Sequence, residues 1–251
     1  MISIEELRFM AKKNGIQSYF QEKDYLQNVF LFNLFKETDK MIFKGGIALK
    51  IMFNYPRFSE DLDFNSNLNP KKIKELVRKA LKQSSLLGLN YSFVKEELFK
   101  EAYTAKIRFE GPLFVGRIES TNTISIDAEK RTELHLKPEW RQAIQDYTDI
   151  PRYFVLVMQE KEIFAEKIRA MYARGKARDF LDVWLMIQNK VEFNKRLTEK
   201  KFREAGKRMR SLNFCGRKEF EQELRGLIYR APDYEQVKKE IKGFLKGKIK
   251  Q

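Results

Sequence analysis

Soft metal ligands and disulfide partners are almost absent from this sequence. Among 251 residues there is one cysteine, Cys215, and one histidine, His135. A single cysteine excludes an internal disulfide, and the two residues together are too few for a structural zinc site. We therefore expect Cys215 to be a core or surface thiol and His135 to be structural rather than catalytic.

Long apolar segments are missing as well. No run approaches the roughly 20 apolar residues that a membrane-spanning helix needs, and residues 1–6 lack the basic start and apolar middle of a signal peptide. We expect a cytoplasmic protein with no membrane partner. Convincing repeats and long low-complexity linkers do not occur either, and the length suffices for one large domain or two small ones.

Positive charge, in contrast, is abundant and unevenly spread. The 50 Lys and Arg residues exceed the 35 Asp and Glu residues by 15. From Ile150 to the end there are 26 basic and 14 acidic residues, a surplus of 12, which leaves a surplus of only 3 for everything before. This distribution suits a polyanion, with nucleic acid as the leading candidate. The alternative is that the Lys-rich helices are only solvated.

The segment between residues 41 and 64 carries the most informative motif. It opens with a short apolar run that can form a buried strand, and Gly45 and Gly46 then allow a close approach of the backbone to another group. A short helix is expected over residues 47–54. A strand, a double glycine and the start of a helix together direct backbone N–H groups toward a position where a phosphate can bind.

Two aspartates with one residue between them follow this turn. In a strand, Asp61 and Asp63 lie on one face, while Leu62 and Phe64 lie on the other. Neighbouring carboxylates repel each other, and Mg²⁺ suits them because it binds one or two carboxylates together with phosphate oxygens. A polar strand edge with solvated aspartates is the simpler alternative. The glycines and the aspartates together favour a metal-dependent nucleotide site.

This motif resembles the signature of the AbiEii/AbiGii toxin family, a branch of the DNA polymerase β-like nucleotidyltransferases. The resemblance rests on Gly-Gly-x-Ala-Leu, which starts at Gly45, and on Arg-x-Ser-x-Asp-Leu-Asp-Phe, which starts at Arg57. One residue departs from the pattern. The family usually has Thr or Ser after the two glycines, and here Ile47 takes that place, so backbone N–H groups would have to do more of the phosphate binding.

A second part of the resemblance lies in two helical motifs: one has a glutamate followed by Ala-x-Lys, from Glu162 through Ala165 to Lys167, and the other is Arg-Asp-x-x-Asp starting at Arg178. Lys167 interrupts an apolar stripe, so it either extends its ammonium group to water or places its charge on a triphosphate. The family pattern favours the triphosphate. Arg178 and Asp182 can form an ordinary i,i+4 pair worth about 0.2–0.5 kcal/mol. The resemblance implies that Asp179 orients Lys167 or the nucleotide, with Asp182 as the alternate.

Asp127 is the candidate for a third carboxylate. Ile124 and Ile126 alternate with Ser125 and Asp127, so Asp127 ends an expected strand on its polar face. In polymerase-β-like transferases, such a residue completes the metal site and helps to deprotonate the attacking hydroxyl, and the resemblance implies this role for Asp127. Many strands also end in Asp merely to start a turn.

Capping signals and periodicity place the other elements. Ser3 with Glu6 resembles a capping box, and Asn69 with Pro70 is a helix-start signal. The aromatic residues of a long helix over 17–36 are expected in the core rather than as a platform for stacked bases. Helices are expected over 3–13, 17–36, 71–87, 198–210, 217–229 and 234–246, and strands near 90–94, 103–109 and 123–127.

The resemblance implies an α+β fold with a mixed sheet in a nucleotidyltransferase domain over 1–150, followed by a helical, basic domain over 151–251. It implies a Mg²⁺-dependent toxin of a type IV-like toxin–antitoxin or phage-defence system that transfers NMP from an NTP to an RNA such as the tRNA 3′ end, with a cognate antitoxin as partner. The implied catalytic residues are Asp61, Asp63, Asp127, Lys167 and Asp179. The implied nucleotide-binding residues are Lys44, Gly45, Gly46, Ser59, Lys167 and Arg178, and the implied metal ligands are Asp61, Asp63 and Asp127.

Three other functions remain open. A transferase that attaches AMP to a protein hydroxyl could use the same aspartates. A nucleic-acid-binding protein without enzymatic activity would require these aspartates to be vestigial. A kinase-like phosphotransferase is disfavoured, because the glycine loop and catalytic-loop signatures of kinases are missing. The sequence leaves open which NTP is used and what the oligomeric state is.

Overall fold

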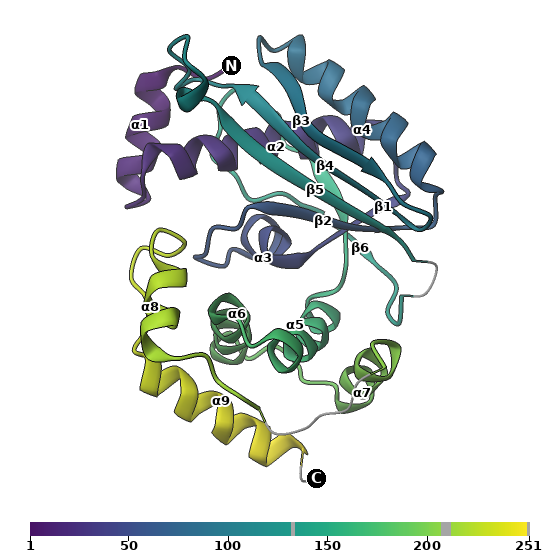
Figure 1. Cartoon of the computed structure of the whole chain (residues 1–251), viewed down its shortest axis with the longest axis vertical. Coiled ribbons are helices and arrows are strands. Elements are labelled where there is room, and N and C mark those ends of the chain that lie inside the picture. Colours follow the sequence, from purple (N-terminus) through teal and green to yellow (C-terminus); the bar gives the residue numbers. More distant parts are fainter. Residues whose placement is uncertain (132–133, 207–211, 250–251) are drawn as a thin grey trace. The chain divides into compact units, whose positions relative to one another are not determined.

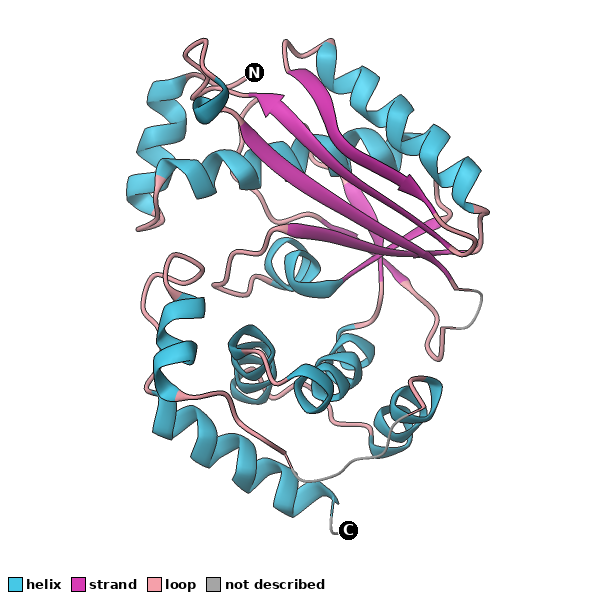
Figure 2. Cartoon of the chain, in the orientation of Figure 1, coloured by secondary structure: helices cyan, strands magenta, loops and turns pink. Residues whose placement is uncertain are grey.

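The computed structural model describes residues 1–131, 134–206 and 212–249 (Figures 1 and 2). The chain divides into two compact units, Met1–Met158 and Gln159–Gln251. The first unit contains a sheet with helices packed on it, and the second is helical among its described residues. No helix in the described ranges is long and apolar enough to pass through a lipid bilayer.

The first unit is organised around a mixed seven-stranded sheet, counted over the described residues. Its strand order is β3-β4-β5-β2-β1-β7-β6. β2 pairs in parallel with β5, and β1 with β7, while the other neighbours are antiparallel. This confirms the expected α+β class. The strands are β1 Met41–Lys44, β2 Asp61–Ser66, β3 Asn90–Leu98, β4 Ala102–Glu110, β5 Asn122–Lys130, β6 Glu139–Gln142 and β7 Phe154–Val157.

Side-chain alternation gives this sheet one apolar and one polar face along β4 and β5. In β4, Tyr103, Ala105, Ile107 and Phe109 are buried, while the residues that alternate with them are exposed or half-buried. β5 follows the same alternation over most of its length. Helices α2 (Ser18–Glu37) and α4 (Pro70–Ser85) contact each other and cover the apolar face (Figure 1).

Two of the expected helix starts are confirmed by their caps. The Ser3 hydroxyl accepts a hydrogen bond from the Glu6 amide at 3.0 Å at the start of α1 (Ile4–Lys13). The Asn69 side chain accepts one from the Lys72 amide at 2.9 Å at the start of α4. Each cap satisfies an amide that has no partner within its own helix, which fixes where the helix begins.

Helix α2 is buried through polar residues as well as apolar ones. Asp24 accepts a hydrogen bond from the Tyr147 hydroxyl at 2.7 Å and forms an ion pair with Lys50. Glu22 accepts a hydrogen bond from the Asn122 side chain at 3.1 Å. Because Lys50 lies in α3 (Gly45–Phe53) and Asn122 begins β5, these contacts tie α2 to two elements that position the aspartate motif.

The prediction that the aromatic residues of this long helix are core residues was wrong for Tyr19. Tyr19 is 42% exposed, whereas Tyr25 and Phe30 of the same helix are fully buried. The Lys23 ammonium group lies 5.4 Å from the centre of the Tyr19 ring.

In its described part, the second unit consists of helices. Some of them contact the next helix in the sequence, and others contact helices further along the chain. α5 contacts α6 and α7, and α6 contacts α8 and α9. The helix expected over 198–210 begins earlier, at Lys195, and residues 207–210 lie outside the described ranges. The helices are α5 Glu160–Arg174, α6 Ala177–Gln188, α7 Lys195–Glu204, α8 Arg217–Leu224 and α9 Tyr234–Ile249.

The expected end of one helix was wrong. The sequence predicted a helix over 217–229, but α8 ends at Leu224, because Arg225 takes an extended conformation and Gly226 a positive φ of 82°. Glycine enters this left-handed region without steric cost, so it ends the helix there. Cys215, just before α8, is buried, and burial raises the pKa of its thiol to about 11, which leaves it unreactive at neutral pH.

Candidate active site

Three aspartates meet on the polar face of the sheet. β2 and β5 are parallel neighbours, and their register places Asp63 opposite Asp127 and Asp61 opposite Ser125. Leu62 and Phe64 alternate with the aspartates and are fully buried on the other face. The carboxylates of Asp61, Asp63 and Asp127 are therefore half-buried on one face, and two of them lie on directly paired residues.

The charges of these carboxylates act on one another. The pKa of Asp127 is raised, first by burial, then by the negative charge of Asp61 and then by that of Glu129. The carboxylate of Asp61 on β2 therefore disfavours ionisation of Asp127 on the neighbouring strand. Such a cluster costs stability unless a cation or a proton compensates it.

The glycine turn lies directly against this cluster. Gly45 has a φ of 82°, and a Cβ on it would collide with the Oδ2 atom of Asp63. A Cβ on Gly46 would collide with the guanidinium of Arg57 and come within 2.8 Å of the Ser59 hydroxyl. The positive φ requires glycine at position 45. At position 46, glycine lets the backbone come close to the side chains of Arg57 and Ser59, in the loop before the aspartate motif.

The loop before β2 is held by a buried glutamine. The side chain of Gln27 donates hydrogen bonds to the carbonyls of Ser59 at 3.1 Å and Glu60 at 3.3 Å. Arg57 is only 3% exposed and donates to the Phe58 carbonyl at 2.8 Å. The sequence predicted Ser59 as a site residue but not Arg57, because the burial of Arg57 and its approach to Gly46 depend on the folded structure.

Ile47, the departure from the family pattern, is fully buried in the first turn of α3. Its side chain therefore serves the core, and it offers no hydroxyl to a ligand. The hydroxyl nearest to the glycine turn comes from Ser59 instead, in the loop that Gln27 holds. The hydroxyl and the guanidinium next to the turn thus come from Ser59 and Arg57 in the loop before β2, and not from α3.

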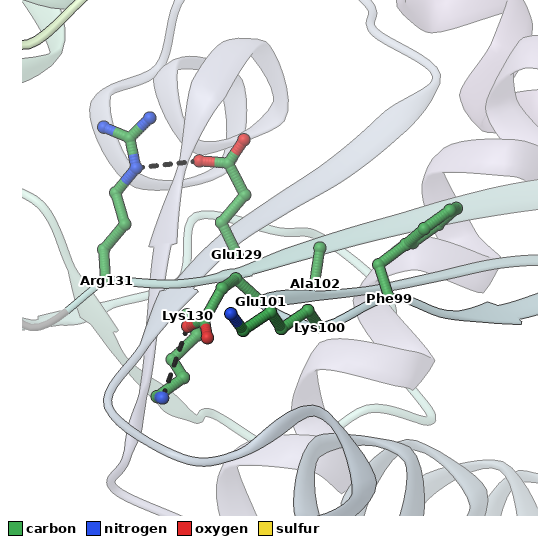
Figure 3. A pocket seen from close by; sticks show the side chains of 7 residues that line it. All are labelled: Phe99, Lys100, Glu101, Ala102, Glu129, Lys130 and Arg131. Carbon is green, nitrogen blue, oxygen red and sulfur yellow. Dashed lines mark ion pairs between the residues drawn. The ribbon is translucent and has the colours of Figure 1, made fainter.

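A shallow pocket of about 390 Å³ adjoins this site at the end of β5 (Figure 3). Glu129, one of its walls, lies two residues after Asp127 and pairs with Lys44 at 3.8 Å and with Arg131 at 2.9 Å. Lys130 pairs with Glu101 across the pocket at 3.3 Å. Lys44 precedes the glycine turn, so the ion pair with Glu129 joins the pocket to the site.

The donor chemistry of the site fits magnesium. Asp61 and Asp63 offer two carboxylates on one face, and Mg²⁺ is typically bound by one or two carboxylates plus phosphate oxygens and waters. Within the described ranges, no three His, Cys, Asp or Glu side chains are grouped so as to hold a metal ion. A magnesium ion at Asp61 and Asp63 would therefore take its other ligands from the nucleotide and from water.

The helical unit contains the other residues that the sequence singled out. Lys167 is 11% exposed, and its ammonium group lies 2.7 Å from Asp182 and 4.0 Å from Asp179. Asp179 is fully buried and accepts two hydrogen bonds from Arg174, at 2.6 and 2.8 Å. Of the two aspartates that the sequence left open, Asp182 therefore contacts Lys167 directly, while Asp179 is bound to Arg174.

Arg178 binds a residue that the sequence spacing did not indicate. Its guanidinium lies 3.4 Å from Glu223 of α8, rather than pairing with Asp182 one turn along its own helix. Glu223 also accepts a hydrogen bond from the Ala177 amide at 2.8 Å, at the start of α6. Arg178 and Glu223 thus link α6 to α8.

We expect Gly45→Ala to impair the site more than the fold. The positive φ and the clash with Asp63 would cost about 1–3 kcal/mol, and displacement of the Asp63 carboxylate by about 1 Å would lower the rate of nucleotidyl transfer about 10²-fold. Urea unfolding and initial transfer rates measure the two effects.

Gly88→Ala is the matched control for this substitution. Gly88 has a φ of 80°, close to that of Gly45, but a Cβ there would meet nothing within 4 Å. It should lose a similar amount of stability and keep its transfer rate. Equal loss of activity in both variants would show that backbone strain alone, rather than contact with Asp63, requires glycine at position 45.

Comparisons with known proteins agree with this arrangement. The family model of the nucleotidyl transferase AbiEii toxins of type IV toxin–antitoxin systems matches residues 29–247. The fold is similar to that of MenT4, a nucleotidyltransferase toxin from Mycobacterium tuberculosis H37Rv, with a TM-score of 0.64 and 19% identity over 88% of this chain and 80% of that chain. It is also similar to JHP933 from Helicobacter pylori, with a TM-score of 0.54 and 18% identity over 76% and 75% of the two chains.

No curated protein sequence matches the chain. The match to the family model includes the glycine turn, the three aspartates of the sheet, Lys167 and the Arg178 motif within its bounds. The fold similarity extends over 88% and 76% of the chain at 19% and 18% identity, so it supports the architecture rather than a shared substrate. The chain belongs to the AbiEii family of nucleotidyl transferase toxins of type IV toxin–antitoxin systems.

Proposed function

We propose that this nucleotidyltransferase transfers NMP from an NTP to an RNA acceptor, such as the 3′ end of a tRNA, with the help of Mg²⁺. The observation that carries the proposal is the register between β2 and β5, which gathers Asp61, Asp63 and Asp127 on one face against the Gly45–Gly46 turn. Magnesium bound there would neutralise the charge that develops on the transferred phosphate. Asp61 and Asp63 would hold it together with phosphate oxygens and water, and Asp127 lies beside them on the paired strand.

Different residues bind the phosphates and accept the proton in the proposed reaction. Backbone amides of the glycine turn, with Lys44, Ser59 and Arg57, bind the phosphates. Asp127 accepts the proton of the attacking hydroxyl. The hydroxyl oxygen bonds to the α-phosphorus while the bond to the β-phosphate oxygen breaks, and pyrophosphate leaves.

We assign the residues of the helical unit to nucleotide binding as well. Lys167 supplies positive charge to the triphosphate, and Asp182 and Asp179 keep its side chain and that of Arg174 in place. Arg178 is a further nucleotide-binding candidate. The basic excess after Ile150 supports an RNA acceptor, because electrostatic attraction to phosphates dominates the affinity of proteins for nucleic acids. The cytoplasm, where NTPs and tRNA are found, is the proposed location, with a cognate antitoxin as partner.

The test is transfer of label from each of the four NTPs in turn to total tRNA or to protein, in the presence of Mg²⁺. We expect labelled RNA with at least one NTP, together with stoichiometric release of pyrophosphate. Labelled protein without labelled RNA would favour the protein-modifying alternative. Label in neither acceptor with any NTP would overturn the proposal, and release of a nucleoside diphosphate would indicate phosphotransfer instead.

A further inference from the structure

The polar face of the sheet continues from the aspartates onto β4, where it carries cations. Lys106 of β4 lies opposite Ser125 of β5, and Ser125 lies opposite Asp61 of β2. Because neighbouring strands are about 4.8 Å apart, the backbone of Lys106 lies about 10 Å from that of Asp61. Arg108 lies on the same face as Lys106, opposite Thr123. Lys106 therefore lies two strands away from Asp61 of the candidate active site.

Lys106 and Arg108 carry charges that no described residue of the first unit pairs with. Among the residues that the structure describes, neither side chain forms an ion pair or a hydrogen bond, and Lys106 is exposed. Lys95 lies directly opposite Lys106 on β3 and is paired with Glu97 at 2.7 Å. Like charges directly opposite each other destabilise a sheet. An anion bound over β3 and β4 would relieve this repulsion.

Hydroxyl groups surround the two cations, and the helices lie elsewhere. Thr104, Thr123 and Ser125 are half-buried on the same face as Lys106, and hydroxyls of this kind often bind phosphate oxygens. Helix α4 packs on the opposite face of β3 and β4 (Figure 1). There, its Lys74 and Arg78 bind Glu96. In the described part of the first unit, the main strand contacts of α3 are with β2 and β1 rather than with β4.

We infer that the polar face of β3, β4 and β5 binds the sugar–phosphate backbone of the RNA acceptor just upstream of its reacting 3′ end. Side chains two residues apart on one strand face are separated by about 7 Å, which is comparable to the distance between consecutive phosphates of a single strand. Lys106 and Arg108 would then contact two consecutive phosphates, while the terminal hydroxyl reaches Asp127. This inference rests on the proposed function and specifies how its acceptor is bound.

The test measures binding of a short, unstructured, fluorescently labelled oligoribonucleotide by anisotropy, at several KCl concentrations and without Mg²⁺ or NTP. In Lys106→Gln/Arg108→Gln, which keeps much of both side-chain stems, we expect the affinity to fall roughly tenfold or more, as for the loss of at least one charge-assisted hydrogen bond. The slope of log affinity against log salt should decrease by about 1.4, because each phosphate contact of a single strand contributes about 0.7.

The control is Lys82→Gln/Arg8→Gln, which removes the same two charge types from exposed positions on α4 and α1. It should bind the oligonucleotide like the wild-type protein, apart from a small effect of net charge. Equal losses in both double variants would overturn the inference, and so would unchanged binding in Lys106→Gln/Arg108→Gln. Either result would leave the proposed function standing if labelled NMP still reaches RNA. Urea unfolding confirms that both double variants are folded.

Discussion

Asp61→Asn is expected to lower the rate of nucleotidyl transfer by about 10²–10³-fold and, at the same time, to stabilise the folded protein at neutral pH. The amide keeps the shape of the carboxylate but removes a charge that the proposed reaction needs for its metal ion. It also removes a charge that repels Asp127 across the β2–β5 pairing. Activity and stability should therefore change in opposite directions.

The stability effect follows from the raised pKa of Asp127. Its pKa in the folded protein lies above the unfolded value, so folding takes up a proton between the two values, and stability falls as the pH rises through that range. Above it, the ionised Asp127 opposes folding. Burial contributes most to this shift in the pKa of Asp127, and the charge of Asp61 comes next. Asp61→Asn should therefore reduce the fall in stability with rising pH without removing it. Urea midpoints measured from acidic to neutral pH test this.

Asp146→Asn is the control, because Asp146 is an exposed carboxylate that pairs with Lys13 away from the three aspartates. It should change neither the rate nor the pH dependence of the urea midpoint by a comparable amount. Wild-type transfer rates in Asp61→Asn would show that the aspartates are vestigial, as a nucleic-acid-binding protein without enzymatic activity requires. Lost activity together with lost stability would mean that Asp61 has a structural partner and that repulsion is not its main interaction.

The sequence predicted those features of the first unit that depend on local rules. The period of two in a strand placed Asp61 and Asp63 on one face, and the structure has them there, with buried Leu62 and Phe64 between and after them. Asn69 and Pro70 predicted the start of α4, because an N-cap side chain and a first-turn proline act within four residues. These signals depend only on residues that are close together in the sequence.

Contacts between distant residues could not be predicted in this way. Asp24 and Glu22 are buried because Tyr147 and Asn122, about a hundred residues away, satisfy them, and the pattern of α2 alone suggests a solvated polar side. Strand β6 has four residues and none of them is fully buried, so only its pairing with β7 defines it. Arg57 likewise became a candidate site residue only through its approach to Gly46.

Lys167→Met should destabilise the helical unit by about 3–5 kcal/mol, because it leaves Asp182 buried without the cation that lies 2.7 Å from it. Loss of transfer activity in this variant would therefore not separate a structural lysine from one that binds nucleotide. Lys167→Met/Asp182→Leu makes the distinction. Replacing a buried ion pair by apolar residues of similar size is often neutral for stability, so the double variant should regain most of the lost free energy of unfolding.

If Lys167 binds the triphosphate, the double variant regains stability but not activity. We expect its transfer rate to stay about 10²-fold or more below that of the wild type, with a raised KM for NTP. Lys201→Met is the control, because Lys201 is a second buried lysine of this unit, 2.7 Å from Glu162 and 3.1 Å from Glu166. It should lose comparable stability and, assayed at a temperature where it is folded, keep its transfer rate. Recovery of full activity in Lys167→Met/Asp182→Leu would assign Lys167 to the structure of the helical unit alone.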